Sequence, residues 1–203
     1  MNIRIYNSFI APLLQEATNT GYLNFRNINL TNDVINNMSD TFVKCGVCIN
    51  GNIGVVMYRQ GKIAFYDITN CRYGGISFEF SGCALVQFSH LGQKYIAHIS
   101  LHDVNNPFDT RTDWNSFLQT ILANELQAQF TNFILFKPFD KFAKREYKKN
   151  YPNVDCCGII DNNDNCYSAI LNKSDYRALD MWTVAKIVRV QNLTNVDFSS
   201  LLL

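Results

Sequence analysis

The chain of 203 residues has few charged side chains, few prolines and glycines, and no long apolar run. Charged residues make up only 17% of it and the formal net charge is +1, so there is no electrostatic reason to expect a nucleic-acid partner. No apolar stretch approaches the roughly 20 residues of a membrane-spanning helix, and we expect no stable membrane insertion. With 4 prolines, 10 glycines and no repeat or polar linker, residues 1–203 are predicted to form a single domain.

The chain is rich in apolar residues and carries an odd number of cysteines. Hydrophobic residues make up 47% and aromatic residues 13%, which excludes a disordered chain. The 7 cysteines cannot all pair with one another, whereas secreted disulfide frameworks usually have an even count. We therefore expect free, mostly buried thiols in a reducing compartment. Polar residues interrupt the first 17 residues, so we expect no conventional signal peptide there.

Short apolar and β-branched runs, separated by turn-forming residues, predict many strands. We expect strands at 42–49, 53–58, 62–66, 83–88, 95–102, 133–136, 157–160, 167–171 and 181–190. The first three runs are expected to follow one another through hairpins, and Leu91-Gly92 is a further turn signal. Apolar residues at three- and four-residue steps predict a helix over 112–130, capped by Thr112. A short helix is also expected to begin at Thr31 or Asn32. The fold class is therefore α+β, a mostly antiparallel sheet system flanked by helices.

All three histidines of the chain follow Cys83 within 20 residues. A thiol beside an imidazole can become the thiolate–imidazolium pair that makes a strong nucleophile. If the turn at 91–92 has an even number of residues, cross-strand partners have an odd index sum, and Cys83 shares a face with His98 and His102. His90 lies at the turn, roughly 20 Å from Cys83 at about 3.3 Å per residue. Both His98 and His102 therefore remain candidates for the base.

The residues Ser81-Gly82-Cys83, with His98 fifteen positions after the cysteine, resemble the catalytic core of a family of protein glutamine deamidases. This family includes the cytotoxic necrotizing factors and the Burkholderia lethal factor, and the chemotaxis deamidase CheD is a distant relative. In the Burkholderia factor and CheD a threonine stands six residues before the cysteine, and Ser77 keeps a hydroxyl at that offset. Phe80 stands where the family has leucine. The resemblance covers about 30 of the 203 residues and does not extend to the rest of the chain.

The resemblance implies a chemistry and a role for each matched residue. Cys83 would attack the side-chain carboxamide of a protein glutamine, His98 would act as base and then acid, and Ser77 would orient the imidazole. Backbone N–H groups near Gly82 and Cys83 would hold the oxyanion. Hydrolysis of the thioester would leave glutamate. The expected fold is a β-sandwich or strongly bent sheet with outer helices, and no cofactor is implied.

The same resemblance implies a bacterial toxin or virulence effector. Its partner would be a host protein, by analogy a small GTPase or a translation-initiation helicase. We expect a monomer that is secreted or injected by a non-classical route and acts in the host cytoplasm.

Several alternatives remain open. The same cysteine could carry out transglutamination if an amine replaces water, or the chain could be a non-catalytic protein-interaction module whose cysteines are core residues. Cys45 and Cys48 form a CxxC that could join other cysteines around zinc, but no second CxxC accompanies it. His98 and His102 would lie about 13 Å apart on one strand, too far to share a metal. The basic stretch 137–149 is either a solvated helix face or a docking surface for an acidic protein or an anionic membrane.

Overall fold

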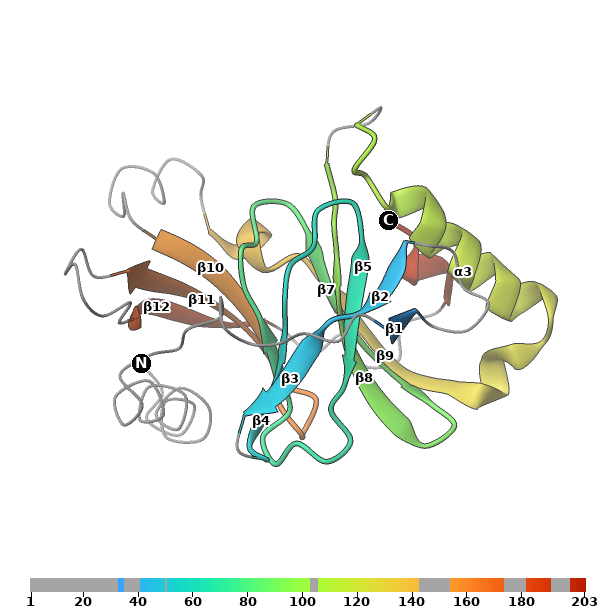
Figure 1. The fold of residues 1–203 in the computed structure, drawn as a ribbon, viewed down its shortest axis with the longest axis horizontal. Coiled ribbons are helices and arrows are strands. Elements are labelled where there is room, and N and C mark those ends of the chain that lie inside the picture. The colour runs from blue at the N-terminus through green and yellow to red at the C-terminus, as the bar shows by residue number, and fades with distance from the viewer. Residues whose placement is uncertain are drawn as a thin grey trace.

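The computed structural model describes residues 33–34, 41–49, 51–102, 106–142, 154–173, 182–190 and 198–203. Within these ranges the chain forms two six-stranded sheets and one α-helix (Figure 1). The first sheet has the order β1 (Asp33–Val34), β2 (Phe42–Lys44), β5 (Ile63–Asp67), β8 (Gln93–Ile99), β7 (Ala84–His90) and β9 (Phe130–Phe136). The second has the order β12 (Trp182–Val190), β11 (Cys166–Lys173), β10 (Val154–Ile160), β6 (Gly75–Ser77), β4 (Ile53–Val56) and β3 (Gly46–Ile49).

Most strand pairs are antiparallel, and among the described pairs β2–β5 and β4–β6 are parallel. The chain crosses from the first sheet to the second at Cys45. The N–H of Cys45 donates to the Phe65 carbonyl at 2.9 Å, and its own carbonyl accepts from the Met57 N–H at 3.2 Å. The predicted strand 42–49 is therefore two strands in two sheets. The hairpin predicted between 53–58 and 62–66 is also wrong, because β4 and β5 belong to different sheets.

The two sheets enclose an apolar core between them. Side chains alternate along β4 and β6, so that Val56 belongs to this core whereas Val55 and Ile76 belong to a second cluster on the opposite face. Gly158 of β10 packs closely against Leu85 of the first sheet. A Cβ at this position would lie 2.6 Å from Pro138 Cγ and 2.8 Å from Leu85 Cδ2. The absence of a side chain there is what permits the close packing.

Helix α3 (Arg111–Ala123) covers the other face of the first sheet (Figure 1). The predicted apolar stripe is confirmed over its first three turns, where the buried side chains are Trp114, Phe117, Leu118 and Ile121. The helix ends at Ala123, and Glu125 adopts a left-handed φ of 56° before a short 3₁₀ turn, η2 (Leu126–Gln129). Phe130 begins β9 instead of ending the helix. The N-cap is Thr110 and not Thr112, and its hydroxyl donates to the Ser100 carbonyl at 2.8 Å.

The predicted fold class is confirmed: the protein is α+β, with mostly antiparallel strands in two sheets and a helix on an outer face. The short helix expected after Thr31 is not found at Asp33–Val34, which form a strand against β2, and the rest of it lies outside the described residues. Most of the basic stretch after Phe142 also lies outside them. In the part of the chain that the structure describes, no helix is long and apolar enough to cross a membrane.

The close approach at Gly158 leads to a stability prediction. Gly158→Ala is expected to destabilise the protein by about 1–3 kcal/mol, because the added Cβ overpacks the contact with Pro138 and Leu85. Gly82→Ala is the matched control, since a Cβ there would meet nothing within 4 Å. The control should change the unfolding free energy by less than about 0.5 kcal/mol. Urea unfolding of both variants measures the difference, and equal stabilities would contradict the packing described here.

Candidate active site

The β7–β8 hairpin fixes which residues can face Cys83. Leu85 pairs with His98, so cross-strand partners have an odd index sum, as the two-residue turn at 91–92 predicts. Cys83 immediately precedes β7, and one further step of this register places it opposite Ser100. His98 and His102 are then its two diagonal neighbours, on the same face and about 7–8 Å away. The register alone therefore does not choose between these two histidines.

His90 is at the other end of the hairpin, as predicted. It pairs with Gln93 next to the turn, and its ring stacks on Phe130 with the centroids 4.3 Å apart. This position excludes His90 from any site around Cys83.

His98 is buried between the sheets and is bound by Ser77 from the second sheet. The distance from Ser77 Oγ to His98 Nδ1 is 2.8 Å, and the same hydroxyl donates to the Val56 carbonyl at 2.7 Å. Ser77 has one proton to donate, and the Val56 carbonyl can only accept. His98 Nδ1 must therefore carry the proton that Ser77 Oγ accepts, which leaves a lone pair on Nε2. Among the described residues Nε2 has no hydrogen-bond partner.

Two aromatic rings hold the imidazole of His98. Phe80 stacks on it with the centroids 4.2 Å apart and the planes 5° from parallel, and Tyr58 lies against it at 5.1 Å with a 51° tilt. The side chain is only 1% exposed, and this burial lowers the pKa of His98 to about 3. The imidazole is therefore neutral at pH 7, with its unpaired Nε2 able to accept a proton.

Cys83 is 3% exposed and rests as a thiol. Burial raises its pKa, and the nearby carboxylate of Asp109 raises it further. Its Sγ donates weakly to the Leu101 carbonyl at 3.9 Å and not to His98. The resting pair is thus a thiol and a neutral imidazole instead of the expected thiolate–imidazolium. Proton transfer between them requires the thiol to rotate away from the Leu101 carbonyl.

The segment before Cys83 is anchored on one side and open on the other. Glu79 has a left-handed φ of 64°, and its N–H donates to Asp155 Oδ1 at 2.9 Å. The next N–H, of Phe80, donates to the Cys156 carbonyl at 3.1 Å, so β10 holds this segment. Ser81 is exposed, and a Cβ at Gly82 would meet nothing within 4 Å. A reactant can therefore reach the chain next to Cys83 from the Ser81-Gly82 side.

Tyr58 is a site residue that the sequence does not reveal. Its hydroxyl lies 3.5 Å from His102 Nε2, and its ring lies against His98, so Tyr58 contacts both candidate histidines. His102 is partly exposed, and its N–H donates to Asp109 Oδ2 at 3.3 Å. The role of the Val56 carbonyl could not be predicted from the sequence either, because its hydrogen bond with Ser77 depends on how the strands assemble. Phe80, adjacent to the motif, is the one member of this set that sequence proximity could have indicated.

The CxxC does not assemble a metal centre in the structure. Cys45 Sγ accepts from Arg59 Nε at 3.2 Å. Within the described ranges, no three His, Cys, Asp or Glu side chains gather closely enough to hold a metal ion. The zinc alternative therefore gains no structural support.

Comparisons of the chain with protein-family models, with curated proteins and with solved structures gave no match.

The burial of neutral His98 predicts a pH-dependent stability. Its folded pKa, about 3, lies below the unfolded value near 6.5, so the unfolded state binds a proton first as the pH falls. The contribution of neutral His98 to the free energy of unfolding is therefore complete above pH 6.5 and is lost progressively as the pH falls towards 3. Between pH 7 and pH 5 the wild type should lose about 2 kcal/mol more than His98→Gln. Urea unfolding at both pH values measures this, and identical losses in the two proteins would refute the assignment.

The Ser77 contact predicts a single imidazole tautomer. Long-range ¹H–¹⁵N NMR of His98 in the wild type should show Nδ1 protonated and Nε2 unprotonated. Ser77→Ala removes the acceptor and leaves a buried N–H unpaired, which costs about 1–3 kcal/mol and frees the tautomer. Ser77→Thr keeps the hydroxyl and should retain the wild-type spectrum. A wild-type Nε2–H tautomer would contradict the assignment.

Proposed function

We propose that this protein is a protein glutamine deamidase in which Cys83 is the nucleophile, His98 the general base and Ser77 the positioning residue. The observation that carries the proposal is the Ser77–His98 contact. It holds the imidazole through Nδ1 and leaves the Nε2 lone pair unpaired, so Nε2 is available to act as a base. The β7–β8 pairing ends at Ala84 and Ile99, and its continuation by one residue would put that histidine on the same face as Cys83. An oriented base beside a thiol is the arrangement that nucleophilic catalysis needs.

The proposed reaction proceeds through a thioester. The Cys83 thiol gives its proton to His98 Nε2, and the sulfur attacks the carboxamide carbon of a glutamine. Backbone N–H groups at Gly82 and Cys83 hold the oxyanion on the open side of the segment. His98 returns the proton to the leaving nitrogen and ammonia departs. Water, deprotonated by His98, then attacks the thioester, which yields glutamate and restores the thiol.

The low pKa of His98 affects the two halves of this reaction differently. Burial makes protonation of the imidazole costly, so taking the thiol proton is the demanding step. Once formed, the imidazolium is a strong acid that readily protonates the leaving amine. Ser77 stabilises this cation because its oxygen already accepts the Nδ1–H bond. The protein therefore favours a neutral resting pair and a charged pair only while substrate is bound.

The substrate class and setting follow from the resemblance of residues 77–98 to the toxin deamidases. We propose a host protein as substrate, in the class of small GTPases or translation-initiation helicases. The protein would act as a monomeric effector in the host cytoplasm after non-classical secretion or injection. Conversion of one glutamine to glutamate places a negative charge where a neutral amide stood, which can disable a binding or catalytic surface.

Two other functions remain as outcomes of the test. Transglutamination uses the same thioester with an amine in place of water. A non-catalytic interaction module is favoured by one observation, since Cys83 is buried, protonated and bonded to the Leu101 carbonyl, as an inert core thiol is.

The direct test is peptide mass spectrometry of host-cell lysate after incubation with the purified protein. The wild type should convert one glutamine of one protein to glutamate, and Cys83→Ser and His98→Gln should each reduce this at least about 100-fold because each removes a member of the pair. Cys48→Ser, which changes a cysteine outside the site, is the matched control and should retain the activity.

An added primary amine separates the two enzymatic readings. A deamidase gives glutamate in its presence, whereas a transglutaminase gives the amine adduct at the same glutamine. A third outcome is that no glutamine changes and that, in the presence of lysate, an alkylating reagent modifies Cys83 no faster than the other cysteines. The protein would then be a non-catalytic interaction module.

A further inference from the structure

Two cysteines outside the proposed active site lie side by side at the edge of the second sheet. Cys48 of β3 pairs directly with Gly54 of β4. Gly54 has no side chain, and Ile68 and Cys71 fill the space beside it: a Cβ at Gly54 would lie 2.3 Å from Ile68 Cγ2 and 3.4 Å from Cys71 Sγ. Directly paired strand residues point to the same face, so Cys48 projects towards the side on which the Cys71 sulfur lies. Cys71 belongs to the apolar core cluster between the sheets, and Cys48 packs against the same cluster.

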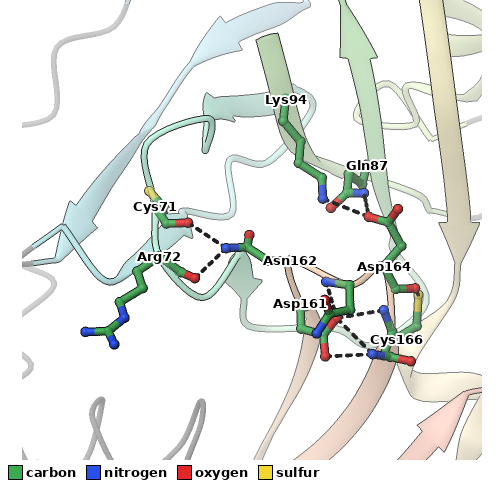
Figure 2. Close-up of polar contacts among 10 residues, drawn as sticks. Cys71, Arg72, Gln87, Lys94, Asp161, Asn162, Asp164 and Cys166 are labelled. Atoms are coloured by element: carbon green, nitrogen blue, oxygen red, sulfur yellow. Dashed lines mark hydrogen bonds and ion pairs between the residues drawn. The ribbon is translucent and has the colours of Figure 1, made fainter. Parts of the chain in front are cut away.

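The backbone of Cys71 is held in place by the β10–β11 loop (Figure 2). Asn162 Nδ2 donates to the Cys71 carbonyl at 3.1 Å and also to the carbonyl of Arg72. The loop itself is fixed to the first sheet, because Asp164 Oδ1 accepts from Lys94 Nζ and Gln87 Nε2, each at 2.7 Å (Figure 2). The hydrogen bonds of Asn162 and Asp164 therefore hold the Cys71 backbone in place.

The two thiols differ in their exposure to solvent. Cys48 is partly exposed, and each of the other six cysteines is buried. Burial raises the pKa of Cys71, and the neighbouring Cys48 raises it further. A soluble oxidant is therefore expected to react with Cys48 first, and Cys71 remains a protonated thiol next to it.

We propose that Cys48 and Cys71 form an oxidative modification site that reacts with hydroperoxides and closes to a disulfide. The Cys48 thiolate attacks the peroxide oxygen, the O–O bond breaks, and Cys48 sulfenic acid and one alcohol or water form. The Cys71 sulfur then attacks the Cys48 sulfur, the S–O bond breaks, and the oxygen leaves as water with the thiol proton. Two thiols are oxidised and one hydroperoxide is reduced.

The disulfide would tie the second sheet to the segment that follows β5 of the first sheet. The closed loop runs from Cys48 to Cys71 and contains Val56, whose carbonyl accepts from Ser77. A covalent link across this loop restricts the unfolded chain, so the oxidised protein is expected to be more stable than the reduced one. This inference is independent of the proposed deamidase function.

The test treats the reduced full-length protein with hydrogen peroxide and follows intact mass and peptide mass. The expected product is a monomer that has lost two hydrogen atoms, with Cys48 and Cys71 in one cross-linked peptide. Dithiothreitol should reverse it, and the oxidised protein should unfold at a higher urea concentration. Cys48→Ser should abolish the cross-link, and because this side chain is partly exposed the variant is expected to fold.

Cys83→Ser is the matched control and should form the cross-link at the wild-type rate, whatever its effect on deamidation. Stable sulfinic acid at Cys48 without a cross-link would overturn the proposal. So would a disulfide that instead joins two molecules or involves another of the seven cysteines.

Discussion

The Ser77 hydroxyl links the two sheets and sets the tautomer of the buried histidine. Ser77 donates to Val56 within the second sheet and accepts from His98 in the first, in the middle of an otherwise apolar core. Ser77 has a single hydroxyl proton, which it donates to Val56, so Nδ1 of His98 must carry its own proton. This fixes the imidazole tautomer and leaves Nε2 unpaired. A buried unpaired nitrogen costs free energy, and such costs are typically retained where they serve function. The chemistry proposed for Cys83 depends on this geometry.

The surroundings explain why the resting site is uncharged. Phe80 and Tyr58 pack against the imidazole, and the thiol of Cys83 is buried as well. In such an environment neither a thiolate nor an imidazolium is stable without the other. In the proposed reaction a substrate amide would enter from the Ser81-Gly82 side, and the negative charge that develops on it would balance the imidazolium. Reactivity would thus be confined to the bound complex.

Local patterns in the sequence predicted much of this arrangement. An even number of residues in the turn at 91–92 predicts cross-strand partners with an odd index sum, and the pairing of Leu85 with His98 in β7–β8 has that sum. Apolar runs located most strands and the first three turns of helix α3. The partition of β4 and β5 between different sheets could not be predicted, because alternation along a strand does not say which sheet it joins. The Val56 and Tyr58 contacts depend on that partition, and so does the neutral state of the pair, since burial follows from how the sheets pack.

The most direct measurement of the central claim is capture of the acyl intermediate on Cys83. Protein mixed with host lysate is quenched rapidly in acid and analysed by mass spectrometry. The account predicts a glutamyl thioester on Cys83, removed by hydroxylamine, that accumulates in the wild type and is absent from His98→Gln. A Cys83 that carries no acyl group, or one that is acylated equally without His98, would contradict a cysteine–histidine catalytic pair.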